Sequence, residues 1–152
     1  MYKVLVTFLV LFGAMLGANT LSAHGAHEKN PYIVHRQSIY NIVNGHMRAL
    51  QAIILLDHPA TSDIAFHANA IKTAFQHQGD AFPKGSEKGS THANSKVWEQ
   101  PEKFSQKQRE ADLAVERLVK AAEQNDKSRI KQSFGELGKA CRSCHDDFRK
   151  KM

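Results

Sequence analysis

Two cysteines and a histidine near the C-terminal end of the chain have the most distinctive chemistry in the sequence. They lie in the segment Cys141-Arg142-Ser143-Cys144-His145, and the 152 residues contain no other cysteine. Apolar or thiol side chains recur here every three or four residues, which predicts one face of a helix: Ile130, Phe134, Leu137, Cys141, Cys144 and Phe148. Residues three apart on a helix share a face, so both thiols can reach one partner.

The C-x-x-C-H pattern is the attachment signature of haem c, in which two thiols bond to the vinyl groups and the histidine ligates the iron. A thioredoxin-like pair would follow a strand and open a helix. A zinc site would need a second pair of ligands, and a disulfide between Cys141 and Cys144 would close too small a loop to stabilise much. The sequence therefore predicts one haem c, covalent through Cys141 and Cys144, with His145 as the metal ligand.

The N-terminal segment has the pattern of an export signal. Lys3 precedes the uncharged run VLVTFLVLFGAMLGA, and LSA follows, ending at Ala23. The run is shorter than the roughly 18–20 apolar residues of a membrane-spanning helix. We expect a signal peptide at 1–23, a single domain at 24–152, no stable membrane span and a periplasmic location, which suits haem c attachment.

The charge of the chain suggests no nucleic-acid partner. Lys and Arg number 21 against 15 Asp and Glu, a formal net charge of +6. The basic residues are scattered and do not alternate with aromatic ones, as they do in single-strand binders. No acid–base pair or nucleophile stands out either, so we do not expect an enzyme.

Four amphipathic helices are expected, with no strand. They cover about 32–56, 64–78, 101–122 and 126–148, and the Gly- and Ser-rich segment 79–96 reads as a long surface loop. Two of the apolar faces include Ile42 in the first helix and Leu113 in the third. Each helix must bury its apolar face against the other helices. The predicted fold is therefore all-α, an antiparallel four-helix bundle with covalently attached haem.

Three segments resemble the cytochrome c prime family of class II c-type cytochromes: HRQSIYNI, VWEQPEKFSQKQ and, most specifically, FGELGKACRSCHDDFRKK. The resemblance covers nearly the whole of 24–152 and implies the same four-helix bundle. Low-spin members supply a methionine from the first helix as sixth iron ligand, whereas high-spin members place a bulky residue there. The matching residue is Tyr40, which implies a five-coordinate iron. Met47, about 10 Å further along the helix, is the source of a low-spin alternative.

The same resemblance implies roles for two arginines. Arg36 would lie near a haem propionate, and Arg149 would lie beside His145. From the residues alone, Arg36 could equally be a solvated arginine near a helix end. Arg149 could belong to a basic tail that complements a helix C-terminus, and Tyr40 could be an ordinary core tyrosine.

The predicted function is an exported, high-spin haem protein that binds the diatomic gases NO and CO and exchanges electrons with an unknown redox partner. The alternatives are a low-spin, six-coordinate electron-transfer cytochrome and a structural bundle without haem. The family also suggests a homodimer through the first two helices. His24 and His27 could take up a stray metal ion. Six further histidines show no ligand spacing and are expected on the surface: His35, His46, His58, His67, His77 and His92.

Overall fold

A computed structural model describes residues 30–78 and 80–151 of the chain. Its elements are α1 (Pro31–Leu55), η1 (Thr61–Asp63), α2 (Ile64–Gln76), α3 (Lys96–Glu99), α4 (Pro101–Glu123) and α5 (Lys127–Phe148). The described part contains no strand, and its one isolated bridge joins Ala93 to Arg149. The predicted signal segment 1–23 lies outside the described residues.

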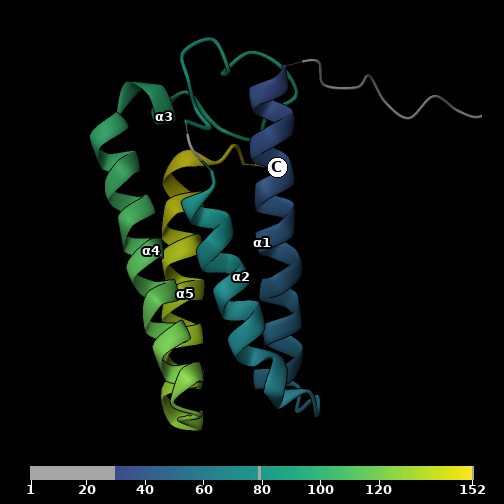
Figure 1. The fold of residues 1–152 in the computed structure, drawn as a ribbon. Coiled ribbons are helices and arrows are strands. Elements are labelled where there is room, and N and C mark those ends of the chain that lie inside the picture. Colours follow the sequence, from purple (N-terminus) through teal and green to yellow (C-terminus); the bar gives the residue numbers. More distant parts are fainter. Residues whose placement is uncertain (1–29, 79, 152) are drawn as a thin grey trace, which may run out of the picture.

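The four long helices form an antiparallel bundle, as predicted (Figure 1). α1 pairs with α2 and α4 with α5, and α2 also packs on α4. α1 and α5 are in contact over a shorter stretch. One end of the bundle holds the α1–α2 and α4–α5 turns. The other end holds the C-terminal end of α5, the segment between α2 and α4, and the start of α1 (Figure 1). We call this second end the site end.

Side-chain caps explain where two of the helices begin. Asn30 Oδ1 accepts from the Tyr32 N–H at 3.1 Å, and Asp126 Oδ1 accepts from the Arg129 N–H at 3.0 Å. Such caps satisfy amides that have no partner in the first helical turn. The predicted helix bounds agree with the structure to within two residues. The single turn α3 was missed, because four residues carry too little periodic signal.

The main core lies along the middle of the bundle and consists of apolar residues from all four long helices. Its members include Val43, Leu50, Ile71, Val115, Leu118, Ile130 and Leu137. This confirms most of each predicted stripe, but two expected core residues are exposed. Ile42 is 49% and Leu113 is 55% accessible, because each stripe buries only the arc that faces a neighbouring helix.

A second, smaller core lies at the site end. Val97, Phe104 and Phe148 are buried there. Phe82, Ala93, Trp98 and Cys144 pack against them. Phe148, which was predicted on the apolar face of the last helix, is thus confirmed as a core residue, and α3 brings Val97 into this cluster.

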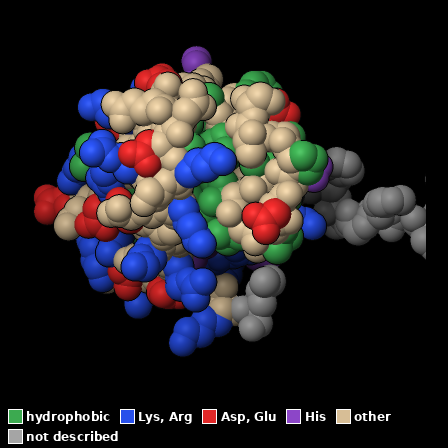
Figure 2. Space-filling model, turned by 90° about the horizontal axis from the view of Figure 1, so that it is seen from below, with side chains coloured by type: hydrophobic (Ala, Val, Ile, Leu, Met, Phe, Trp, Pro, Cys, Tyr) green, Lys and Arg blue, Asp and Glu red, His purple; other side chains and the backbone are tan. Residues whose placement is uncertain are grey.

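The outer surface is mixed in charge. Figure 2 views the bundle from the end opposite the site end, and Lys and Arg side chains are interspersed there with Asp and Glu. Hydrophobic side chains are also exposed on this face. Among the described residues, no helix is both long enough and apolar enough to span a bilayer.

Candidate haem-attachment site

The two cysteines lie in the last two turns of α5 and are both half-buried free thiols. Cys141 packs against the main core, whereas Cys144 packs against the smaller aromatic core. The pair therefore stands where the two cores meet, with both side chains directed to the inner side of the helix. This is the shared helical face that the i, i+3 spacing predicted.

Burial keeps both thiols protonated. It raises the pKa of Cys141, and burial together with the neighbouring Cys141 raises the pKa of Cys144 to about 11. Oxidoreductase C-x-x-C pairs do the opposite, because a helix N-terminus lowers the pKa of their nucleophilic thiol. A C-terminal position and raised pKa values argue against a redox-active dithiol.

His145 follows Cys144 directly, and its side chain is partly exposed and partly covered by neighbouring residues. Partial burial lowers the pKa of this histidine, and the positive charge of Arg149 lowers it further. The neutral imidazole thus favoured is the form that ligates metal ions. Arg149 ends the helix, and its backbone N–H donates to the His145 carbonyl oxygen at 3.0 Å. The structure therefore brings Arg149 beside His145, while its functional role stays a prediction.

Tyr40 approaches the thiols from α1. Its hydroxyl donates to Gln78 Oε1 at 2.9 Å, and its ring centroid lies 6.5 Å from that of Phe82. Burial raises the pKa of Tyr40 well above its ordinary value, and the nearby Cys144 adds to the rise, while a hydrogen bond with Gln108 opposes it. Tyr40 is therefore an inward-facing, neutral phenol close to Cys144.

Arg36 is almost fully buried, with 3% of its surface exposed. Its Nη1 donates to the Ala81 carbonyl oxygen at 3.1 Å and to Ser86 Oγ at 2.8 Å. Its Nη2 donates to the Ser86 carbonyl oxygen at 2.7 Å and to Thr91 Oγ1 at 2.8 Å. The guanidinium carbon also lies 4.9 Å from the centroid of the Phe82 ring, close enough for a cation–π contact.

These contacts correct two expectations from the sequence. Arg36 is not a solvated arginine, because the loop between α2 and α4 encloses it. The loop is not purely a surface segment either, since Ala81, Ser86 and Thr91 are buried in it. Contact of Arg36 with a haem propionate stays a prediction.

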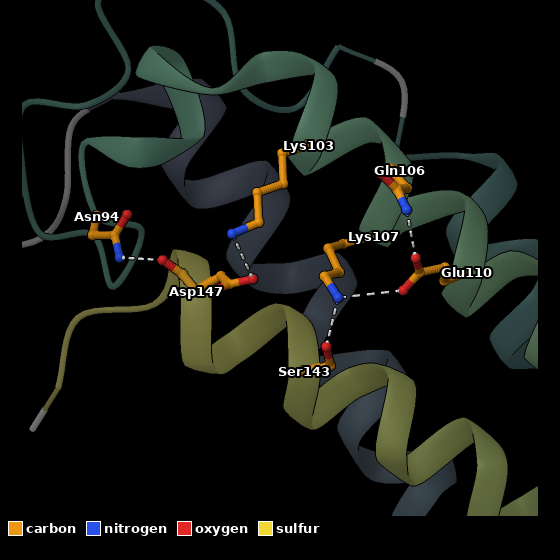
Figure 3. A network of polar contacts seen from close by, with 7 residues as sticks. All are labelled: Asn94, Lys103, Gln106, Lys107, Glu110, Ser143 and Asp147. Carbon is orange, nitrogen blue, oxygen red and sulfur yellow. Dashed lines mark hydrogen bonds and ion pairs between the residues drawn. The ribbon is translucent and has the colours of Figure 1, made fainter.

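A polar network joins α4 to α5 around the thiol pair (Figure 3). Lys107 Nζ donates to Ser143 Oγ at 2.7 Å and lies 3.5 Å from Glu110 Oε2. One turn away, Lys103 Nζ lies 3.2 Å from Asp147 Oδ2. No sequence signal marked Lys107, because its partner on α5 is 36 residues away.

Two of the histidines are not independent surface residues. His46 on α1 and His67 on α2 place their Nδ1 atoms 2.8 Å apart. The six histidines were expected on the surface, but His46 and His67 are half-buried and in contact with each other. The register between α1 and α2, which a spacing along one helix does not reveal, brings the two rings together.

The residues at this site fit haem c. Two protonated, inward-facing thiols share a helical face, a neutral-favouring imidazole follows them, and aromatic rings line the adjoining core. Zinc is less suitable, since in the described part of the chain no three His, Cys, Asp or Glu side chains gather closely enough to hold a metal ion. Fold and site together define a helical-bundle c-type cytochrome with a C-terminal attachment motif.

Comparisons with known proteins agree with this class. The profile of the cytochrome c' family matches residues 32–149. Cytochrome c' of Rhodospirillum rubrum is 26% identical over 142 residues, which cover 93% of this chain and 97% of that protein. The chain belongs to the cytochrome c' family, and it therefore binds one covalent haem c.

Solved structures show the same fold. The crystal structure of cytochrome c' from Rubrivivax gelatinosus matches with a TM-score of 0.75 at 28% identity, covering 82% of this chain and 98% of that one. A nitric oxide complex of a variant cytochrome c' from Alcaligenes xylosoxidans matches with a TM-score of 0.74 at 26% identity, covering 80% and 94%.

Proposed function

We propose that this chain is an exported haem c protein whose five-coordinate, high-spin iron binds NO and CO. Cys141 and Cys144 would hold the haem, and His145 would ligate its iron. The bound haem supplies an iron that takes a diatomic ligand and cycles between the ferric and ferrous states. The nitric oxide complex of the Alcaligenes xylosoxidans relative supports this proposal.

The observation that carries the proposal is the state of Tyr40. The residue that faces Cys144 from α1 is a phenol whose raised pKa keeps it protonated. A neutral phenol is a poor iron ligand, since haem proteins that use tyrosine bind it as phenolate. In the haem-loaded chain the bulky ring would exclude large ligands from the iron, and its hydroxyl already donates to Gln78 Oε1. Bound O₂ would therefore gain little stabilisation from it.

The low-spin alternative depends on Met47. Its side chain packs against the main core. It lies seven residues after Tyr40, about 10 Å along the helix axis. Both facts support a packing role for Met47. Electron exchange with a redox partner needs only the haem and remains compatible with either coordination state.

We also propose that the chain is exported to the periplasm and forms a homodimer through α1 and α2. Ile42 on α1 and Phe66 on α2 are large apolar residues with 49% and 64% of their surface exposed. Together with Ile39 and Ala70 they line a shallow apolar groove between the two helices. Sedimentation velocity of the natural chain and of a Phe66→Glu variant tests the homodimer. If both chains sediment as monomers, the proposed homodimer is rejected.

Absorption spectra of the haem-loaded chain test the coordination state. We expect broad, unsplit ferrous bands that change when NO is added. Tyr40→Met should give sharp, split low-spin bands, whereas the control Met47→Leu should resemble the natural chain. Split bands that resist NO and disappear in Met47→Leu would instead establish the low-spin cytochrome. If the exported chain carries no haem, the whole proposal fails.

A further inference from the structure

An imidazole pair lies between α1 and α2. His46 Nδ1 and His67 Nδ1 are 2.8 Å apart, and the two ring planes meet at 53°. Both side chains are half-buried in the single chain. The Phe66 ring stands edge-on to both imidazoles, with centroids 5.7 Å from His46 and 5.1 Å from His67. The Phe66 ring therefore packs against one side of both imidazoles.

The contact between the two Nδ1 atoms constrains their protons. A short N···N hydrogen bond needs one N–H donor and one lone pair that accepts, so at least one of the two rings is neutral at Nδ1. Burial lowers the pKa of His46, and the neighbouring His67 lowers it further. The pair is thus biased toward neutral imidazole, the form that ligates late first-row transition metals.

The distance between the two nitrogens is compatible with one coordination geometry in particular. With metal–nitrogen bonds of roughly 2.0–2.1 Å, neighbouring ligands at 90° stand about 2.9 Å apart, and tetrahedral ligands stand about 3.3 Å apart. The observed separation of 2.8 Å is that of an ordinary hydrogen bond and lies close to the first value, so the two rings can become adjacent ligands by turning, with little change in their spacing. Neighbouring positions at 90° belong to square-planar or tetragonal sites, which Cu²⁺ prefers, and Cu²⁺ also binds nitrogen ligands most tightly in the divalent series.

We propose that His46 and His67 form a two-nitrogen binding site for Cu²⁺ that bridges α1 and α2. Both rings bind through Nδ1 as the Nε2–H tautomer, so the proton between the two Nδ1 atoms moves through solvent to Nε2 of the ring that carried it. The ion lies to one side of the line between the two nitrogens. Water fills its remaining positions, since no three potential metal ligands gather within the described residues. The site uses no residue of the haem-attachment motif. Binding joins two helices of the folded chain, so it stabilises the native state over the unfolded one.

Calorimetric titration of the haem-loaded ferric chain with Cu²⁺ tests the site. We expect one ion per chain. His46→Asn and His67→Asn should each weaken binding at least ten-fold. The matched control His35→Asn changes an exposed histidine on the same helix as His46 and should leave the affinity unchanged. A second control, His24→Ala with His27→Ala, removes the histidines near the N-terminus and should also retain the site.

Electron paramagnetic resonance of the natural chain provides a readout that needs no variant. With ¹⁵N-labelled histidine, bound Cu²⁺ should show hyperfine coupling to two imidazole nitrogens. In a separate thermal-melting experiment, Cu²⁺ should raise the melting temperature of the natural chain but not that of His46→Asn. The proposal is overturned if the single variants bind as tightly as the natural chain. It also fails if only the His24/His27 variant loses binding, or if one ion binds per two chains.

Discussion

The two cores of this bundle are built differently. The main core consists of aliphatic side chains and alanines on four helices, together with Phe134. The core at the site end is aromatic, with Phe82, Phe104 and Phe148 in edge-to-face contacts at centroid distances of 4.9 and 5.1 Å. Beside it, the buried guanidinium of Arg36 holds the loop that follows α2. Cys141 borders the first core and Cys144 borders the second.

The two cores therefore have different roles: the main core stabilises the bundle, and the aromatic core positions the residues of the site end. Aliphatic burial is non-directional, so the main core tolerates apolar replacements that conserve its volume. Edge-to-face rings and bidentate hydrogen bonds have preferred geometries, so they define where the loop and the end of α5 lie. A haem site needs such positioning, because its supporting residues must hold the attachment and ligand groups in place.

The largest expected effect comes from the main core. Leu118 is fully buried, so Leu118→Ala should lower the free energy of unfolding by about 2–5 kcal/mol, from lost burial and the cavity left behind. Chemical denaturation of the haem-loaded chain measures this. Leu113→Ala, on the exposed side of the same helix, should change it by no more than about 0.5 kcal/mol. Equal losses in the two variants would contradict the division between core and surface on α4.

Arg36→Met tests the site end. It leaves the buried carbonyl oxygens of Ala81 and Ser86 without their donor, which should cost about 2–3 kcal/mol. Thr91 Oγ1 keeps the hydrogen bond from the Ala93 N–H. Because the loop can open to water, we expect hydrogen exchange to speed up mainly in residues 81–91, with little change in α4.

Two further variants sharpen that comparison. Arg36→Lys should not restore protection, since an ammonium cannot reproduce the planar fork of the guanidinium. Arg117→Met, which removes an exposed pair with Glu136, should leave the loop protected. Uniform loss of protection through the bundle in Arg36→Met would show that the two cores are one cooperative unit.

At high pH the free energy of unfolding should depend on Tyr40, and this effect should be smaller than that of Arg36→Met. The folded chain holds the phenol proton to a higher pH than the unfolded chain, whose tyrosines ionise near 10. The stabilisation from Tyr40 is therefore complete below pH 10 and is lost as the pH rises from 10 toward the raised pKa. Tyr40→Phe should remove this loss, measured as the unfolding free energy against pH. Tyr32→Phe, at an exposed tyrosine, should keep it, and a slope that is unchanged in Tyr40→Phe would refute the assignment.

The smallest effect is expected for the exposed ion pair at the site end. Lys103 and Asp147 are 50% and 34% exposed, so Lys103→Met should cost less than about 1 kcal/mol, and added salt should reduce even that. Urea unfolding at low and high salt measures both quantities. If Lys103→Met lowered the free energy of unfolding by more than about 2 kcal/mol even in high salt, this ion pair would contribute as much to stability as Arg36 does.

The sequence by itself determined what depends on near neighbours along the chain. The spacing of apolar residues predicted the four long helices, because helical faces repeat every three to four residues. The same rule placed Cys141 and Cys144 on one face with His145 next to them. Tyr40 was predicted to face inward for the same reason.

Only the tertiary structure decided what depends on distant segments. The partners of Arg36 lie 45–55 residues away, and those of Lys107 and His46 lie 36 and 21 residues away. Ile42 and Leu113 are likewise exposed because, in the part of the chain that the structure describes, no neighbouring helix packs over their side of α1 or α4. Such contacts arise from the register and rotation of packed helices. Periodicity within one helix carries no information about either, because many registers bury the same apolar stripe.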